Sequence, residues 1–211
     1  MYFGEVTDPN IRHIFRDAGD FIVRPLKCGK FTLYAYAIDG LTSGADTSEY
    51  VIKPITDNLQ GDTIQALYTS ALRGRVYNSV ADPCRDLDTV ALKLVNGFCV
   101  ILFPEAGAIA FEVKTGEKRG ISAPEVENTV KGAKDAFVET VRTNTSLLRR
   151  HLRSPELRLY ETRVGRRSLT NVTVCYVEGI TNPTLVGRMK KRLNDMDTDG
   201  FLSPAAVEEA V

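Results

Sequence analysis

The sequence lacks the signals that define several large classes of protein. None of its four cysteines forms a Cys-x-x-Cys pair, and no histidine lies at metal-ligand spacing from one. The N-terminus has no basic segment followed by an apolar one, so no secretory signal peptide is expected. The longest apolar stretch, residues 98–111, is interrupted by Pro104, Glu105 and Gly107 and is shorter than the ~20 residues of a membrane helix. We therefore expect a soluble, intracellular fragment with reduced cysteines, of which Cys99 and Cys175 lie in apolar strand patterns typical of a core.

Enzyme signatures are also missing. The sequence has no Gly-x-Ser-x-Gly elbow, no Walker loop and no Gly-x-Gly-x-x-Gly motif. His13 and His151 lie in helical patterns with no nucleophile motif nearby. Glu125 and Glu127 precede a predicted helix, where acidic side chains favour the helix dipole. Because no catalytic triad and no set of metal ligands can be assembled, we expect a protein that is not an enzyme and has no cofactor.

One metal-like pattern lies near the C-terminus. Asp195, Asp197 and Asp199, followed by Gly200, match the first half of an EF-hand calcium loop. The last position of the loop, where a bidentate glutamate should close the site, is Ala206. Because two ligand oxygens are missing, we predict a polar turn and no metal site.

Alternating and helical patterns divide the chain into two similar halves. Strands are predicted at residues 21–26, 31–38, 98–104, 108–114, 157–164 and 171–180, and helices at residues 8–18, 46–58, 63–73, 86–94, 183–194 and from 203. The order of elements before Pro124 is echoed after it. We therefore predict an α/β (α+β) fold of two small α/β subdomains, each a mixed sheet with helices. They are expected at residues 1–122 and 123–211 and to be joined near residues 120–132.

The longest helical pattern opens the second predicted subdomain, at residues 130–152. Apolar residues at intervals of three, four or seven are expected to share its buried face: Val130, Ala133, Phe137, Val141, Leu148 and Leu152. Basic residues occupy much of the remaining surface, and Pro155 ends the pattern. This helix is expected to contribute both to the core and to a charged contact surface.

Charge is unevenly distributed along a chain that is neutral overall, with 27 basic and 27 acidic residues. Residues 1–130 carry 13 basic and 17 acidic side chains, residues 131–192 carry 14 and 5, and residues 193–211 carry 0 and 5. Such a change of sign indicates either an anionic partner for the basic segment or charge pairing between segments. No nucleic-acid-binding module is recognisable, so nucleic acid is not expected. An anionic membrane surface is the better partner if the protein is tethered to one.

A block of residues around the long helix resembles a known family. The stretch ISAPEVENTVKGAKDAFVETVRTNTSLLRRHL, residues 121–152, is similar to the GerA family of spore germination proteins, A-subunit type. The matching positions are Pro124, Glu127, Gly132, Asp135, Phe137, Glu139, Asn144, Leu147, Arg149 and Arg150. DFIVRPL from Asp20, AIDGL from Ala37 and VGRRSLTNVTVCYVEGITNP from Val164 also resemble it. The sequence departs from the pattern at Ala123, Ala133-Lys134 and His151, and leaves open whether it belongs to the receptor A subunits or to the stage V sporulation protein AF branch.

The resemblance implies a function in germination. Family proteins continue into transmembrane helices, so the chain is expected to be the N-terminal domain of a protein of the inner spore membrane, on the cytoplasmic (spore core) side. It would act in nutrient-germinant signalling and in assembly of the complex that triggers ion release. Expected partners are other subunits of that complex, its own transmembrane domain and further copies of itself. The alternative is direct binding of an amino acid or sugar germinant in the cleft between the two subdomains.

The candidate binding residues all lie on the predicted long helix. Under either hypothesis the contact or ligand surface is expected to include Glu139, Arg142, Asn144, Arg149 and Arg150. A solvent-exposed helix face explains the same residues, because exposed ion pairs contribute little to stability. The sequence does not decide between these readings.

Overall fold

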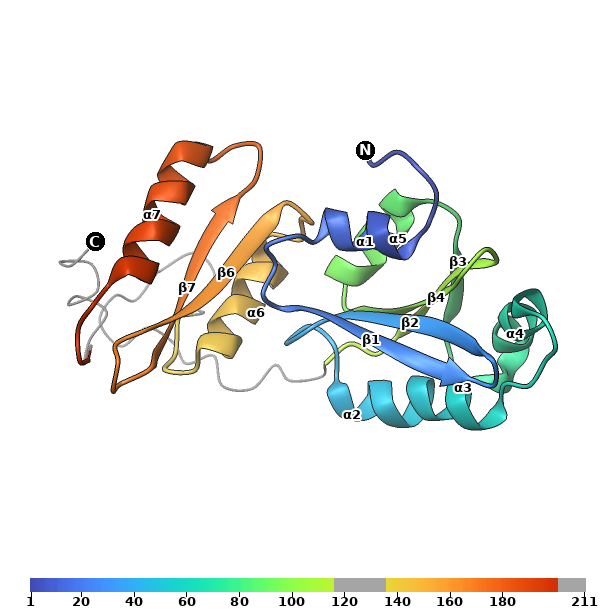
Figure 1. The fold of residues 1–211 in the computed structure, drawn as a ribbon. Coiled ribbons are helices and arrows are strands. Elements are labelled where there is room, and N and C mark those ends of the chain that lie inside the picture. Colours follow the sequence, from blue (N-terminus) through green and yellow to red (C-terminus); the bar gives the residue numbers. More distant parts are fainter. Residues whose placement is uncertain (116–135, 201–211) are drawn as a thin grey trace, which may run out of the picture. The chain divides into compact units, whose positions relative to one another are not determined.

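A computed structural model describes residues 1–115 and 136–200 (Figure 1). Contacts between Cα atoms group residues 1–14 and 20–155 into a first compact unit, and residues 15–19 with the chain from Glu156 into a second. The junction predicted near residues 120–132 and the helix predicted from residue 203 lie outside the described residues. The boundary predicted between residues 122 and 123 therefore stays a prediction.

The first unit is built on a five-stranded antiparallel sheet. Its strand order is β1-β2-β4-β5-β3, with β1 (Phe21–Cys28), β2 (Phe31–Ile38), β4 (Phe98–Phe103), β5 (Gly107–Glu112) and β3 (Ala81–Cys84). Every residue of β4 is buried, which explains why its sequence is a continuous apolar run. The strand β3 was missed by the sequence patterns because it has four residues and contains Pro83, which is tolerated only where a sheet ends.

Helices cover both faces of this sheet (Figure 1). One face packs against α2 (Gly44–Thr47), the π-helical turn η1 (Ser48–Ile52), α3 (Lys53–Asn58), α4 (Ile64–Ser70) and the turn η2 (Ala71–Arg75). The other face is covered by α1 (Asp8–Ile14) and α5 (Leu87–Val95). Three of these helices have an N-terminal capping side chain: Ser43, Thr63 and Asp86 each accept a hydrogen bond from a backbone N–H in the first turn. The predicted helices in this region are confirmed with shifts of at most two residues at their ends, except that the helix predicted at residues 8–18 already ends at Ile14.

The second unit contains a hairpin and a helix. Strands β6 (Leu157–Val164) and β7 (Thr170–Val177) pair antiparallel, and α7 (Pro183–Asp195) follows, with Asn182 as its cap. The Gly19 N–H donates to the Leu159 carbonyl over 2.8 Å, which joins residues 15–19 to β6. Lys190 of α7 lies 2.9 Å from Asp17, and its hydrogen bond holds the pKa of that carboxyl below its usual value.

The fold class is confirmed as a mixture of helices and sheets, but the strand pairs within both sheets are antiparallel instead of mixed. Three cysteines are buried, whereas Cys175 is exposed, so its expected place in a core was wrong. The exposed residues of β7 are Asn171 and Cys175, which lie on the same face of the two-stranded sheet because side chains alternate along a strand. Within residues 1–115 and 136–200, no helix is both long enough and apolar enough to span a bilayer.

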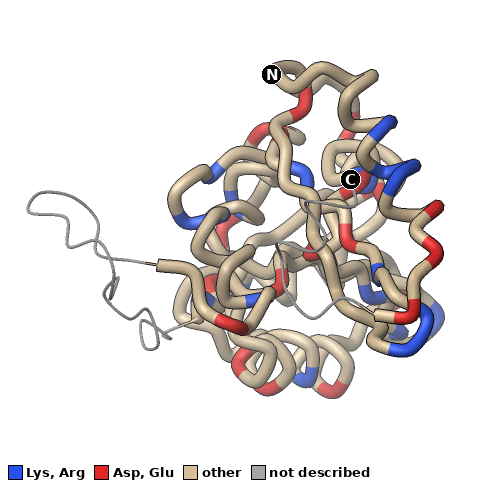
Figure 2. Tube along the Cα trace, turned by 90° about the vertical axis from the view of Figure 1, so that its left-hand side faces the viewer, with Lys and Arg blue, Asp and Glu red and all other residues tan. Residues whose placement is uncertain are grey.

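Many basic residues of the segment 131–192 are paired with acidic ones. In the first unit Arg142 pairs with Asp39 and Arg149 with Asp20. In the second unit Arg158 pairs with Glu178, Arg166 with Asp197 and Lys190 with Asp17. Lysines and arginines lie among acidic residues along the trace in Figure 2. The structure thus provides the charge pairing that was one of the two explanations for the basic segment.

Candidate functional site

The helix α6 (Val141–His151) carries most of the predicted site residues and is shorter than predicted. Residues 136–140 are not helical, and residues 130–135 lie outside the described part of the chain. Asn144 explains where the helix begins: its side-chain amide donates to the Val138 carbonyl over 2.6 Å and accepts from the Val138 N–H over 2.7 Å. These two bonds hold residue 138 against the first turn in a non-helical conformation.

The buried face of α6 is also different from the predicted one. Phe137, Val141 and Leu152, which were expected in the core, are exposed. The buried residues are Thr145, Ser146, Leu147 and Arg149. The helix therefore packs through mostly polar side chains, which the apolar periodicity of the sequence could not indicate.

A buried ion pair anchors α6 to the sheet of the first unit. Arg149 donates from Nε and Nη2 to the two carboxylate oxygens of Asp20, each over 2.8 Å, and from Nη1 to the Ser154 carbonyl over 3.1 Å. Arg149 is 0% exposed and Asp20 is 1% exposed. The Asp20 carbonyl in turn accepts a hydrogen bond from the Asp39 N–H over 2.8 Å. The pair thus connects the helix to the start of β1 and to the end of β2.

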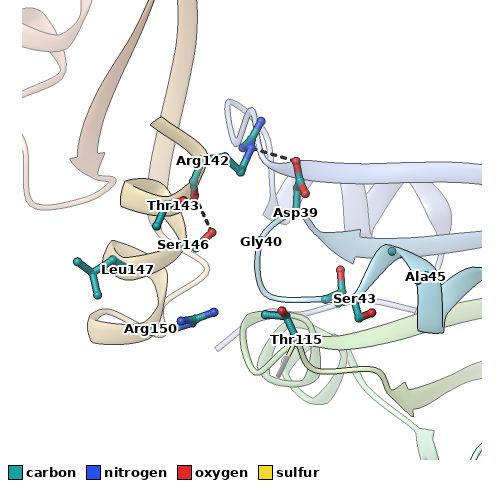
Figure 3. A pocket seen from close by; sticks show the side chains of 12 residues that line it. Asp39, Gly40, Ser43, Ala45, Thr115, Arg142, Thr143, Ser146, Leu147 and Arg150 are labelled. Atoms are coloured by element: carbon teal, nitrogen blue, oxygen red, sulfur yellow. Dashed lines mark hydrogen bonds and ion pairs between the residues drawn. The ribbon is translucent and has the colours of Figure 1, made fainter. Parts of the chain in front are cut away.

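The loop that follows β2 lies against the N-terminal half of α6 (Figure 3). Gly40 has a φ of +80°, and a Cβ atom built on it would lie 1.8 Å from the Ser146 Oγ. Only glycine fits this approach, both in conformation and in space. Ser146 itself donates to the Arg142 carbonyl over 2.7 Å, and Arg142 Nε lies 3.0 Å from an Asp39 carboxylate oxygen.

A pocket of about 430 Å³ opens between this loop and the helix. Its walls are polar for the most part, with hydroxyl groups from both sides and the guanidinium of Arg150 directed toward the loop (Figure 3). The lining residues are Asp39, Gly40, Thr42, Ser43, Gly44, Ala45, Thr115, Arg142, Thr143, Ser146, Leu147 and Arg150. All of them belong to the first unit.

A second hollow of about 310 Å³ adjoins the first, because Thr115 and Arg150 line both. It is bordered by Lys114 and by Arg153, whose Nη1 donates to the Asn96 side chain over 3.3 Å. Arg150 therefore stands between two polar hollows that together contain several cationic groups and one carboxylate, Asp39.

This arrangement suits a small polar molecule. Guanidinium groups bind carboxylates through paired hydrogen bonds, a carboxylate such as Asp39 accepts from an ammonium group, and hydroxyl groups serve either role. No group of three metal-ligating side chains occurs in residues 1–115 and 136–200. The pocket therefore offers hydrogen-bonding partners for carboxylate, ammonium and hydroxyl groups.

The predicted site residues have different positions in the structure. Arg142 and Arg150 line the pocket. Arg149 is buried in the ion pair, and Asn144 holds Val138. Glu139 is exposed in the bend before α6. Sequence reasoning missed the pocket residues outside α6, although the Asp39-Gly40 pair directly after a strand marked the loop.

Comparisons with known proteins agree on one family. A sequence profile of the Bacillus/Clostridium GerA spore germination proteins matches residues 9–211. Stage V sporulation protein AF of Bacillus subtilis (strain 168) is 34% identical over 142 residues, which are 66% of this chain and 29% of that protein. Spore germination protein GerLA of Bacillus cereus is 28% identical over 208 residues, which are 95% of this chain and 41% of that protein. The chain spans less than half the length of these relatives.

A solved structure shares the fold. The crystal structure of the N-terminal domain of the A subunit of the Bacillus megaterium spore germinant receptor GerK3 matches with a TM-score of 0.66 at 19% identity. The match covers 89% of this chain and 69% of that chain. At this level of identity the comparison establishes the fold and not the roles of individual side chains.

We predict that replacing Arg149 destabilises the first unit strongly. Arg149→Met leaves the buried Asp20 carboxylate without its cation, a change that costs about 3–5 kcal/mol. The free energy of unfolding, measured in urea, tests this. Arg153→Met, which alters an exposed arginine, should change it by less than about 0.5 kcal/mol. An equal effect of the two variants would show that the pair does not anchor the helix.

Gly40, in the loop before α2, and Gly44, the first residue of α2, provide a matched pair for testing the close approach of this loop to α6. Gly40→Ala combines a left-handed conformation with a collision against Ser146, and should cost about 2 kcal/mol or more. Gly44→Ala meets no atom within 4 Å and should be neutral or slightly stabilising. Thermal unfolding of the two variants distinguishes them; a stable Gly40→Ala protein would contradict the described contact.

Proposed function

The chain belongs to the Bacillus/Clostridium GerA family of spore germination proteins, and we propose that it is the N-terminal domain of a membrane-bound member. In this proposal it acts in nutrient-germinant signalling and in assembly of the germination complex that triggers ion release. The domain lies on the spore-core side of the inner spore membrane, with other germination subunits and its own transmembrane domain as partners. An anionic membrane surface is a further candidate partner.

The family match over residues 9–211 carries this proposal. Relatives named as germination proteins align with most of the chain, and each is much longer than the chain. Both the receptor A subunits and stage V sporulation protein AF are among the relatives, so either branch accommodates the proposed role.

The exposed part of the α6 region is the surface we assign to assembly. Glu139 is exposed, whereas Arg142 and Arg150 are half-buried at the pocket. These residues do not hold the buried core of the first unit, unlike Arg149. Charge changes at Glu139 and Arg150 therefore address contacts with partners more directly than changes at Arg149.

We predict that Glu139→Lys combined with Arg150→Glu in the full-length protein reduces co-purification of the other germination subunits. Ion release after nutrient addition should fall in parallel, because assembly precedes signalling. Arg24→Glu, which changes an exposed charge on β1, is the matched control and should leave both measurements unchanged. Normal assembly and germination of the double variant, with a normal thermal melt, would rule out this surface.

The alternative function is direct binding of a germinant, and the pocket between the loop after β2 and α6 favours it. Its guanidinium groups, the Asp39 carboxylate and the hydroxyl groups match the carboxylate, ammonium and hydroxyl groups of amino acids and sugars. This pocket lies within the first unit, whereas the sequence-based expectation placed the ligand in a cleft between subdomains. We assign the alternative to the pocket.

Titration with amino acids and sugars, followed by NMR, tests this alternative. Shifts are expected in residues 39–45 and in α6. Arg150→Ala should weaken binding about tenfold or more, because a hydrogen bond to a charged group contributes about 1.5–3 kcal/mol. Arg24→Ala is the control. The absence of shifts at millimolar concentrations would eliminate the pocket as a germinant site without affecting the assembly role.

A further inference from the structure

The outer edge of β7 differs from the other sheet edges. The edge strand β1 contains Pro25 and two basic residues, and the edge strand β3 is short and contains Pro83. Prolines, charges and short length are devices that prevent edge strands from pairing with other chains. The strand β7, with the sequence TNVTVCYV, has eight residues and neither a proline nor a charge. Such an edge is open to pairing.

The alternation of antiparallel hydrogen bonds shows which residues of β7 point toward this edge. The Glu178 N–H donates to the Glu156 carbonyl over 2.9 Å, so this opposed pair is hydrogen-bonded across the hairpin. Bonded pairs recur at every second residue, which leaves the odd-numbered residues of β7 directed outward. The opposite edge agrees: the carbonyl of Leu159, the partner of Cys175, points outward and accepts from Gly19.

The outward groups at the end of β7 already have partners within the hairpin and its following turn. The Val177 N–H donates to the Thr181 hydroxyl over 3.3 Å, and its carbonyl accepts from the Thr181 N–H over 2.9 Å. Asn171 and Thr173 lie in the first half of the strand, and no described strand pairs with their outer edge. Their two N–H groups and two carbonyls form a short template for another strand.

We propose that β7 pairs antiparallel with β7 of a second copy of this chain, with Val172 opposite Val172 of the second copy. In this register Asn171 of each copy faces Thr173 of the other. Each of the two facing pairs exchanges two hydrogen bonds, so the outward N–H and carbonyl groups of Asn171 and Thr173 are satisfied in both copies. The two hairpins become one four-stranded sheet, which is more stable than an isolated two-stranded one.

A second copy suits this edge because the strand is complementary to itself. A twofold axis through Val172 uses the same residues on both sides, as closed dimers do. The strand carries no charge that would repel its copy, and the β-branched Val172 side chains meet as a favourable cross-strand pair.

Pairing through β7 would provide a contact surface for the assembly role proposed above, and in that respect the proposal rests on that role.

The proposed register predicts a specific cross-link. At a non-hydrogen-bonded antiparallel pair the Cα atoms are about 4.5 Å apart, within the range that a disulfide spans. In a Cys175→Ser background, Val172→Cys should therefore form a covalent dimer with oxidised glutathione. Val174→Cys, on the same face but opposite residue 170 of the second copy, should lose this product.

Charge at the facing positions provides a second test that does not depend on disulfide formation. Asn171→Lys with Thr173→Lys places lysine opposite lysine twice and should abolish the dimer seen by sedimentation. Asn171→Lys with Thr173→Glu places opposite charges together in the same register and should preserve it. Thermal melts of the 211-residue variants confirm that both remain folded.

Several outcomes would overturn the proposal: equal cross-linking at residues 172 and 174, a wild-type chain that sediments as a monomer and forms no Val172→Cys product, or equal effects of the two charge variants. The first two results are also those expected if another segment of the same chain occupies the edge of β7. Co-purification of other germination subunits with the variant Asn171→Lys, Thr173→Lys distinguishes self-association through β7 from the proposed function. If self-association is lost while that co-purification persists, the proposed function stands on its own.

Discussion

The position of α6 depends on the buried pair of Arg149 and Asp20. A guanidinium and a carboxylate that are both removed from water are tolerated only when each finds its partner in good geometry. The two parallel hydrogen bonds of 2.8 Å and the third bond to Ser154 provide this. Because Asp20 also accepts from the Asp39 backbone, one carboxylic acid residue connects the helix with the beginning of β1 and the loop after β2.

The pocket follows from this constraint. Once α6 is held beside the loop, Gly40 is the residue that lets the two backbones approach, and Ser146 occupies the space where a Cβ atom would lie. Arg142 and Arg150, on either side of Ser146, then line a hollow whose other wall is the loop. Because α6 packs against the loop mostly through polar side chains, groups that can form hydrogen bonds line the hollow between them.

The second unit is smaller, and its two-stranded hairpin needs support from other segments. A two-stranded hairpin buries little by itself, and here residues 15–19, α7 and the Lys190–Asp17 pair support it. This support covers one edge of the hairpin at Leu159 and leaves the edge of β7 with Asn171 and Thr173 directed outward. An edge without prolines or charges is open to pairing with another chain.

The family, the order of most elements and the mixture of helices and sheets could be predicted from the amino-acid sequence. Those features depend on local periodicity and on motifs such as the block from residue 121 to residue 152. Three features could not be predicted without the folded structure: α6 begins at Val141, Arg149 is buried, and Cys175 is exposed. The reason is physical. An arginine is expected at the surface from its sequence alone, whereas here folding places a carboxylate from 129 positions away in the chain against it.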